Sequence, residues 1–113
     1  MKTWTLVFRK SDKDNFEQIR NGSKSIETRA NSIKYEPIKA GDMLIFSCDG
    51  EKLLKKISRR YHWKSIDEMV KELPFKRIMP NIESVEEMKK VYASYPNYTE
   101  KIKEHGLLGF ELE

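Results

Sequence analysis

Residues 16–29 read FEQIRNGSKSIETR, and this segment contains the clearest structural signals in the chain. Phe16 and Ile19 are three positions apart, so they would lie on the same side of a short helix. Gly22 follows Asn21 and can take the left-handed conformation that ends many helices, because it has no Cβ. The segment therefore predicts a helix, a sharp turn and the start of a new element.

A strand is predicted directly after this turn, over residues 25–30. Its side chains would alternate between two faces, with Ile26, Thr28 and Ala30 on one and Ser25, Glu27 and Arg29 on the other. Lys24 would leave the turn as a mobile cation suited to a phosphate or carbonyl oxygen. Glu27 and Arg29 can pair while Arg29 keeps donors for a phosphate and Glu27 accepts from a base amino group. The same spacing also fits a solvated strand face without function.

Strands are also predicted at both ends of the chain, where apolar and polar residues alternate. The apolar positions are Trp4, Leu6 and Phe8 at the start, and Leu108, Phe110 and Leu112 at the end. Between them, the apolar run 43–48 is followed by Asp49-Gly50, a strong hairpin signal. We therefore expect a return strand from Lys52 toward Tyr61.

Two capping boxes predict helices between this hairpin and the last strand. Ser65 precedes Glu68, Ser84 precedes Glu87, and residues 99–104 would form one more helical turn. The tyrosines of this region, Tyr92, Tyr95 and Tyr98, are interpreted mainly as core residues. Strands at both ends with helices between them predict an α+β fold, with a barrel that closes on its terminal strands.

Composition narrows the possible functions. The 113 residues fit one domain, which we expect to span residues 1–113. No apolar run approaches the about 20 residues of a membrane span, so we expect no membrane association and a cytoplasmic location. The single Cys48 excludes an intramolecular disulfide, and two histidines with one cysteine give no zinc pattern, so no metal or cofactor is expected.

The predicted return strand is strongly basic. Six Lys or Arg residues and no acid lie in residues 52–64, and the net charge of the chain is +4. Arg59 and Arg60 could neutralise phosphates of single-stranded RNA while Tyr61 stacks on a base. They would point to opposite faces of the strand, so at most one arginine serves a given groove. Tyr61 could instead pack in the core.

The segment 16–29 with the turn at Gly41-Asp42 resembles the signature of the ASCH family, a helix, then G-x-K-x-x-E-x-R, then a GD turn. The matching positions are Gly22, Lys24, Glu27 and Arg29. The order of the other expected elements is also similar over most of the chain. The resemblance implies a small PUA-like mixed β-barrel with flanking helices, whose signature residues line a cleft for RNA or a nucleotide-like small molecule. Ser25 lies beside these residues and joins the binding candidates.

The resemblance also implies enzymatic alternatives. Some ASCH-like proteins are amidohydrolases that deacylate N4-acetylcytidine with a Lys, a Thr and a Glu, and others are ribonucleases. Lys24 matches the lysine, but Glu27 stands where the threonine would be. The catalytic acid would fall near Pro80, and the nearest carboxylate is Glu83. If the protein is an enzyme, Lys24 and Glu27 are therefore its catalytic candidates.

These observations rank three functions. Binding of RNA or a nucleotide-like ligand comes first, an amidohydrolase or ribonuclease second, and a protein-interaction module third. A deep pocket with Lys24 within hydrogen-bond reach of Glu27 would favour an enzyme. An open basic groove that runs to Arg60 would favour RNA, and a flat apolar patch would favour a protein partner.

Overall fold

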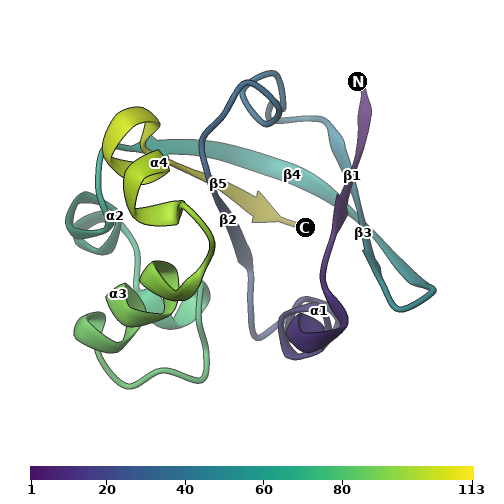
Figure 1. Ribbon diagram of the computed structural model, residues 1–113. Helices are drawn as coiled ribbons and strands as arrows, with labels where there is room; N and C mark the ends of the chain where they lie inside the picture. The colour runs from purple at the N-terminus through teal and green to yellow at the C-terminus, as the bar shows by residue number, and fades with distance from the viewer.

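The computed structural model describes residues 1–113 and is organised around a five-stranded sheet (Figure 1). The strands are β1 (Thr3–Val7), β2 (Ile26–Ala30), β3 (Met43–Cys48), β4 (Glu51–Trp63) and β5 (Leu107–Leu112). The helices are α1 (Lys13–Asn21), α2 (Ile66–Glu72), α3 (Val85–Ser94) and α4 (Tyr98–His105), with short 3₁₀ turns η1 (Lys10–Asp12) and η2 (Phe75–Arg77). The predicted α+β class is confirmed.

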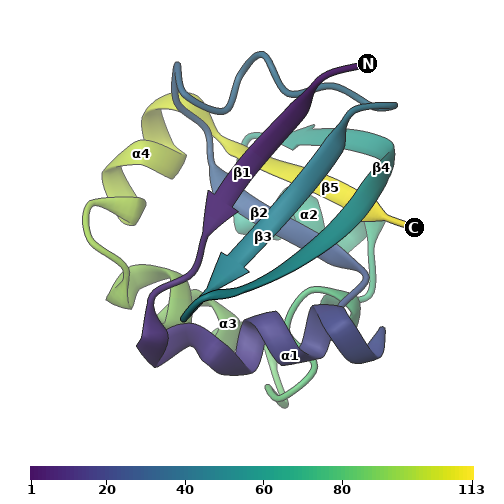
Figure 2. The same ribbon diagram turned by 90° about the vertical axis from the view of Figure 1, so that its right-hand side faces the viewer.

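The sheet has the strand order β1-β3-β4-β5-β2 and curls into a half-barrel (Figure 2). β1 is parallel to β3, and all other neighbours are antiparallel. The long strand β4 causes the curl, because its first half pairs with β3 and its second half with β5. The register shifts between Ile57 and Arg59, which is the type of irregularity that bends a strand.

The terminal strands both belong to this sheet, as predicted, but they are not neighbours. β5 lies between β4 and β2, while β1 and β2 are the two edges. The expectation that the barrel closes on its terminal strands is therefore wrong. Alternation of apolar residues identifies a strand, but it does not identify the strand's partner, and the half-barrel stays open between β1 and β2.

Apolar side chains form two cores, one on each side of β5. Phe16 and Ile19 of α1 pack in the first core, inside the curl of the sheet. The second core lies under α2, α3 and α4, where Ile26 of β2 is buried. Leu107 belongs to the second core and Leu108 to the first, so β5 is covered on both faces. The alternative of a solvated face on β2 is wrong, because Glu27 is buried and Arg29 is only partly exposed.

Local signals set the ends of the helices. Gly22 ends α1 in the left-handed conformation, with a φ of 87°. The Ser65 side chain accepts a hydrogen bond from the Glu68 amide, and Ser84 does the same for Glu87. None of the helices is both long and apolar enough to cross a bilayer. The turn at Gly22 delivers the chain into β2, which carries the candidate site.

Candidate functional site

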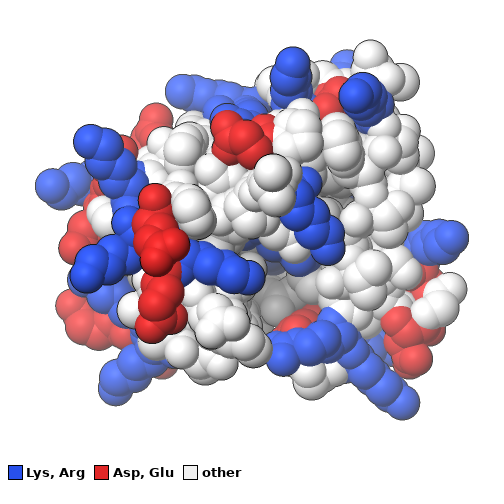
Figure 3. Space-filling view, turned by 45° about the horizontal axis from the view of Figure 1, so that its top comes forward, with Lys and Arg blue, Asp and Glu red and all other residues white.

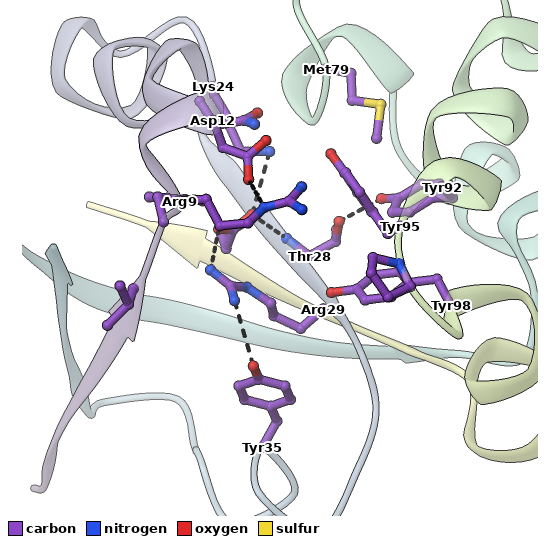
Figure 4. Close-up of a pocket in the computed structure, with 15 residues that line it drawn as sticks. Arg9, Asp12, Lys24, Thr28, Arg29, Tyr35, Met79, Tyr92, Tyr95 and Tyr98 are labelled. Carbon is purple, nitrogen blue, oxygen red and sulfur yellow. Dashed lines mark hydrogen bonds and ion pairs between the residues drawn. The ribbon is translucent and has the colours of Figure 1, made fainter. Parts of the chain in front are cut away.

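A pocket of about 310 Å³ lies where the half-barrel is open, between the end of β1 and β2 (Figure 4). The loop before β3 and the segment from α3 to α4 complete its walls. This volume is at the lower end of the about 300–1,000 Å³ of small-molecule sites. The lining residues are Val7, Phe8, Arg9, Asp12, Asn15, Lys24, Glu27, Thr28, Arg29, Tyr35, Met79, Tyr92, Tyr95, Pro96 and Tyr98.

The floor of the pocket is a buried row of charges. The Lys24 side chain is 4% exposed and that of Glu27 is 5% exposed, and their Nζ and Oε1 atoms are 3.5 Å apart. Lys24 Nζ also donates to the backbone carbonyl of Ile78 at 2.6 Å. The expectation of a mobile cation at Lys24 is therefore wrong. The carbonyl that holds this lysine belongs to a segment far away in the sequence, and local spacing could not show it.

Glu27 is held from both sides. Its Oε1 atom accepts from the Thr28 amide at 2.9 Å, and its Oε2 atom lies 3.3 Å from Arg29 Nη2. The carboxylate thus separates two cations, Lys24 and Arg29. Both oxygens of Glu27 already have partners. This carboxylate therefore mainly fixes the positions of the two cations and is less available as an acceptor for a ligand.

Arg29 connects the floor with the wall. Its guanidinium lies over the rings of Phe8 and Tyr35, at 5.3 and 5.8 Å from the ring centroids. Nη1 is 3.5 Å from the Tyr35 hydroxyl, and only 13% of the side chain is exposed. Arginine has five N–H donors. Two long contacts leave most of this donor capacity for a ligand.

Burial changes the acid–base properties of the pocket. Desolvation lowers the pKa of Lys24 below its ordinary value, and the Glu27 carboxylate opposes this shift. Desolvation also raises the pKa of the Tyr92, Tyr95 and Tyr98 hydroxyls. The tyrosines therefore stay neutral donors at physiological pH, and Lys24 releases its proton more readily than a surface lysine.

Three tyrosines from α3, its end and α4 form the aromatic wall. The Tyr95 and Tyr98 rings meet edge to face with centroids 5.1 Å apart, and Tyr92 stacks on Tyr98 at 6.4 Å. Tyr92 is buried and its hydroxyl shares a hydrogen bond with Thr28 Oγ1. Tyr95 and Tyr98 are only partly buried, so their rings offer surface to a ligand.

Arg9 and Asp12 lie at the mouth, on the side of β1 and α1 (Figure 4). Arg9 Nε donates to Asp12 Oδ2 at 2.8 Å. The Arg9 side chain is 62% exposed, in contrast to the floor residues. The pocket thus combines a dry charged floor, an aromatic wall and a solvated charged mouth.

Similarity to known proteins identifies the family of this chain. A family model described as the ASCH domain matches residues 12–113. The chain belongs to the ASCH domain family. Its structure is similar to the crystal structure of hypothetical protein PH0355, with 32% identity, a TM-score of 0.82, and coverage of 100% of this chain and 98% of that one. It is also similar to the solution NMR structure of protein PF0455 from Pyrococcus furiosus, at 28% identity, a TM-score of 0.75, and coverage of 98% and 96%.

A comparison with curated proteins gave no match. The family match and the structural similarity to PH0355 confirm the predicted ASCH family and the PUA-like fold class. Membership of the ASCH family supports a general function in RNA binding or a related activity.

This ASCH domain brings together only part of the predicted binding set. Lys24, Glu27 and Arg29 all line the pocket. Gly22 ends α1 outside the pocket, and the Ser25 hydroxyl accepts from Arg77 Nε at 2.9 Å. These two residues shape the segment without reaching the cavity.

The basic strand β4 contributes nothing to this pocket. Arg59 lies over the Tyr61 ring at 4.6 Å, and Tyr61 is 6% exposed with its hydroxyl bonded to Glu111. Arg60 donates to the backbone carbonyls of Ile38 and Glu36 at 2.9 and 3.2 Å. The proposed RNA track over Arg59, Arg60 and Tyr61 therefore does not join the site. Tyr61 was misplaced because its strand is covered by helices that come later in the sequence.

Sequence reasoning missed several residues that line the pocket of this ASCH domain. They are Arg9, Asp12, Asn15, Tyr35, Met79, Tyr95 and Tyr98, of which the last two were assigned mainly to the core. The three-residue spacing of Tyr92, Tyr95 and Tyr98 was the available signal. For the others, the sequence carries no pattern that separates them from ordinary loop residues.

The acid expected near Pro80 has no counterpart in the pocket. Met79 lines the cavity at this point, and Glu83 is 81% exposed beside Lys76. Glu27 and Asp12 are the pocket's carboxylates. No group of three or more His, Cys, Asp or Glu side chains is arranged to hold a metal ion.

Proposed function

We propose that this pocket binds one nucleobase, presented by RNA or by a nucleotide-like small molecule. The observation that carries the proposal is the buried Lys24–Glu27–Arg29 row under a wall of tyrosines. A binding site for a planar heterocycle with polar edges needs both the charged row and the aromatic wall. Aromatic rings bind its faces by stacking, and fixed charged donors bind its edge.

The groups fit a base with ring carbonyls better than an apolar ring. Arg29 has unused N–H donors, and Lys24 carries a cation in reach of the same space. The Thr28 and Tyr92 hydroxyls share one hydrogen bond, so this pair can adapt as donor or acceptor. Tyr95 and Tyr98 expose ring surface beside them.

Nuclear magnetic resonance titration with single nucleosides tests this proposal. The amide signals of Thr28 and Arg29 should shift on addition of a pyrimidine nucleoside, and Tyr98→Leu should weaken binding by about tenfold, because stacking contributes about 1–3 kcal/mol per base. Arg59→Ala serves as the control and should bind as the wild type does, since Arg59 is outside the pocket. Shifts that cluster on β4 instead of β2 would overturn the proposal.

A hydrolase is the second candidate, and a specific observation favours it. Lys24 is buried, its pKa is lowered, and Glu27 lies 3.5 Å from it. A neutral lysine amine can serve as a base or nucleophile in amide hydrolysis, and a neighbouring carboxylate can take up a proton. A buried lysine beside a carboxylate is better suited to deacylation of an acylated cytidine than a protonated lysine on the surface would be.

Hydrolysis of N4-acetylcytidine separates the two candidates. In an amidohydrolase, Glu27→Gln should lower the rate by about a hundredfold or more while substrate still binds. In a binding module, neither the wild type nor the variant releases acetate, and Glu27→Gln reduces affinity only in part. Equal turnover by both proteins would exclude Glu27 from proton transfer.

A further inference from the structure

We infer that the mouth of this pocket binds a phosphate group of the ligand through Arg9, so that the preferred ligand is a nucleotide and not a nucleoside. The inference rests on the proposed function and adds a second subsite to it. Arg9 lies two residues after the end of the first edge strand and projects to the cavity from the side opposite the tyrosines (Figure 4).

Arg9 has the donors that a phosphate needs. Its one hydrogen bond uses Nε, with Asp12 Oδ2 as the acceptor, and both terminal nitrogens of the guanidinium are without a protein partner. A planar guanidinium binds two phosphate oxygens at once. Because the pair with Asp12 is exposed and only three residues apart, its contribution to stability is small, and exchanging it for a ligand costs little.

The charge of the pocket points in the same direction. Three cations, Arg9, Lys24 and Arg29, face two carboxylates, Asp12 and Glu27, which leaves one positive charge in excess. The Arg9–Asp12 pair at the mouth is neutral in sum, and the excess arises on the floor, where Lys24 and Arg29 share Glu27. The excess therefore favours an anionic ligand for the pocket as a whole, and the position of its phosphate follows from exposure. Lys and Arg side chains also border a hollow on the face shown in Figure 3.

The exposure of the two regions assigns the phosphate to the mouth. Lys24 and Glu27 are almost fully buried, and a dianion placed between them would lose nearly all of its hydration. Arg9 keeps 62% of its side chain in solvent, so a phosphate beside it stays partly hydrated. The neutral base can then occupy the dry interior against the tyrosines.

Calorimetry with a nucleoside and with its 5′- and 3′-monophosphates tests the inference. For the wild type, one monophosphate should bind about tenfold tighter than the nucleoside, as expected for one charge-assisted contact. In Arg9→Met, the ratio of the two affinities should fall to about one. Lys10→Met removes the same charge from the neighbouring exposed residue, which does not line the pocket, and should keep the ratio of the wild type.

Asp12→Asn should change the affinity for a monophosphate in the opposite direction to Arg9→Met. Asp12 makes no side-chain cap bond to α1, so the change leaves the helix start intact. It removes a negative charge from the mouth and weakens the hydrogen bond from Arg9 Nε, because an amide oxygen is a poorer acceptor than a carboxylate. Monophosphate binding should therefore become tighter by several-fold. Weaker binding in this variant would contradict the inference.

The outcomes separate this inference from the proposed function. If nucleoside and monophosphates bind equally, or if Arg9→Met keeps the phosphate preference, the phosphate subsite is wrong while base binding stands. If neither ligand binds, both fail. A dinucleotide that retains the gain assigns the phosphate to RNA, and a gain limited to the monoester assigns it to a free nucleotide.

Discussion

At the level of single residues, the burial of Lys24 changes what its substitution should do. A lysine that leaves a glycine turn is expected to be dispensable for folding, but here the ammonium binds the Ile78 carbonyl and Glu27. Lys24 and the Ile78 carbonyl are 54 residues apart, and no local pattern connects them. Lys24 therefore has a structural role in addition to the functional role that we propose for it.

Lys24→Ala should consequently destabilise the protein. The change leaves the Ile78 carbonyl without its donor, and such a loss costs about 1–3 kcal/mol in buried positions. Urea unfolding of the variant should show this decrease in the free energy of unfolding. Lys10→Ala, on the exposed surface, should stay within about 0.5 kcal/mol of the wild type. Equal stability of both variants would mean that Lys24 is solvated in solution.

The lowered pKa of Lys24 also predicts a pH dependence of stability. Between this lowered pKa and the ordinary lysine value, the unfolded chain binds a proton that the folded chain has lost. The free energy of unfolding therefore rises with pH in this interval. The difference in unfolding free energy between the wild type and Lys24→Met should grow in favour of the wild type as the pH rises toward the ordinary pKa of lysine. A difference independent of pH would show that the pKa of Lys24 is ordinary.

At the level of elements, the sequence predicted what depends on near neighbours. The caps at Ser65 and Ser84, the stop at Gly22 and the hairpin at Asp49-Gly50 are all local, and all were found. Strand order and the composition of the pocket depend on residues that are distant in sequence, and these were predicted only where the family signature covered them.

Another element-level constraint lies where α4 passes into β5. Gly106 has a φ of 82°, and a Cβ at this position would overlap the backbone carbonyl of Trp63. The chain can turn here only because residue 106 has no side chain. This close approach fixes the start of β5 against the end of β4.

Gly106→Ala should therefore lower the free energy of unfolding by more than the positive φ alone would explain. We expect a loss of about 2 kcal/mol or more, because strain and overlap add. Gly50→Ala is the matched control, since Gly50 has a similar φ of 83° but no atom within 4 Å of the added Cβ. Thermal unfolding of both variants should show the larger decrease for Gly106→Ala. A similar decrease would mean that Trp63 moves aside.

At the level of the whole molecule, charge is spread over the surface, whereas we propose that the pocket binds a single nucleobase. The net charge is +4, and the basic strand β4 lies outside the pocket, with Arg60 bound to backbone carbonyls. The lysines of β4, Lys52, Lys55 and Lys56, form no ion pairs, but they do not line the pocket. We therefore expect the pocket, with Arg9 at its mouth, to supply the principal contacts to a ligand.

Binding of a short RNA should accordingly depend only weakly on salt. The slope of log K against log salt should be near −1, because each neutralised phosphate of a single strand contributes about −0.7. Fluorescence anisotropy at several salt concentrations measures this slope, and the double variant Arg59→Ala/Arg60→Ala should leave it unchanged. A steep slope that becomes shallower in the double variant would restore β4 as the RNA track.

The place of β5 in the sheet also determines when a growing chain can fold. β2 leaves the ribosome well before β5, yet its only partner in the sheet is β5, with Ile26 opposite Glu111. Until β5 has been synthesised, β2 has an unpaired backbone and its charged side chains stay in water. Pairing at this sequence separation is slow and leaves apolar strands exposed meanwhile. The nascent chain therefore cannot complete the pocket before β5 has been synthesised, because β2, which carries the floor of the pocket, has no partner in the sheet until then.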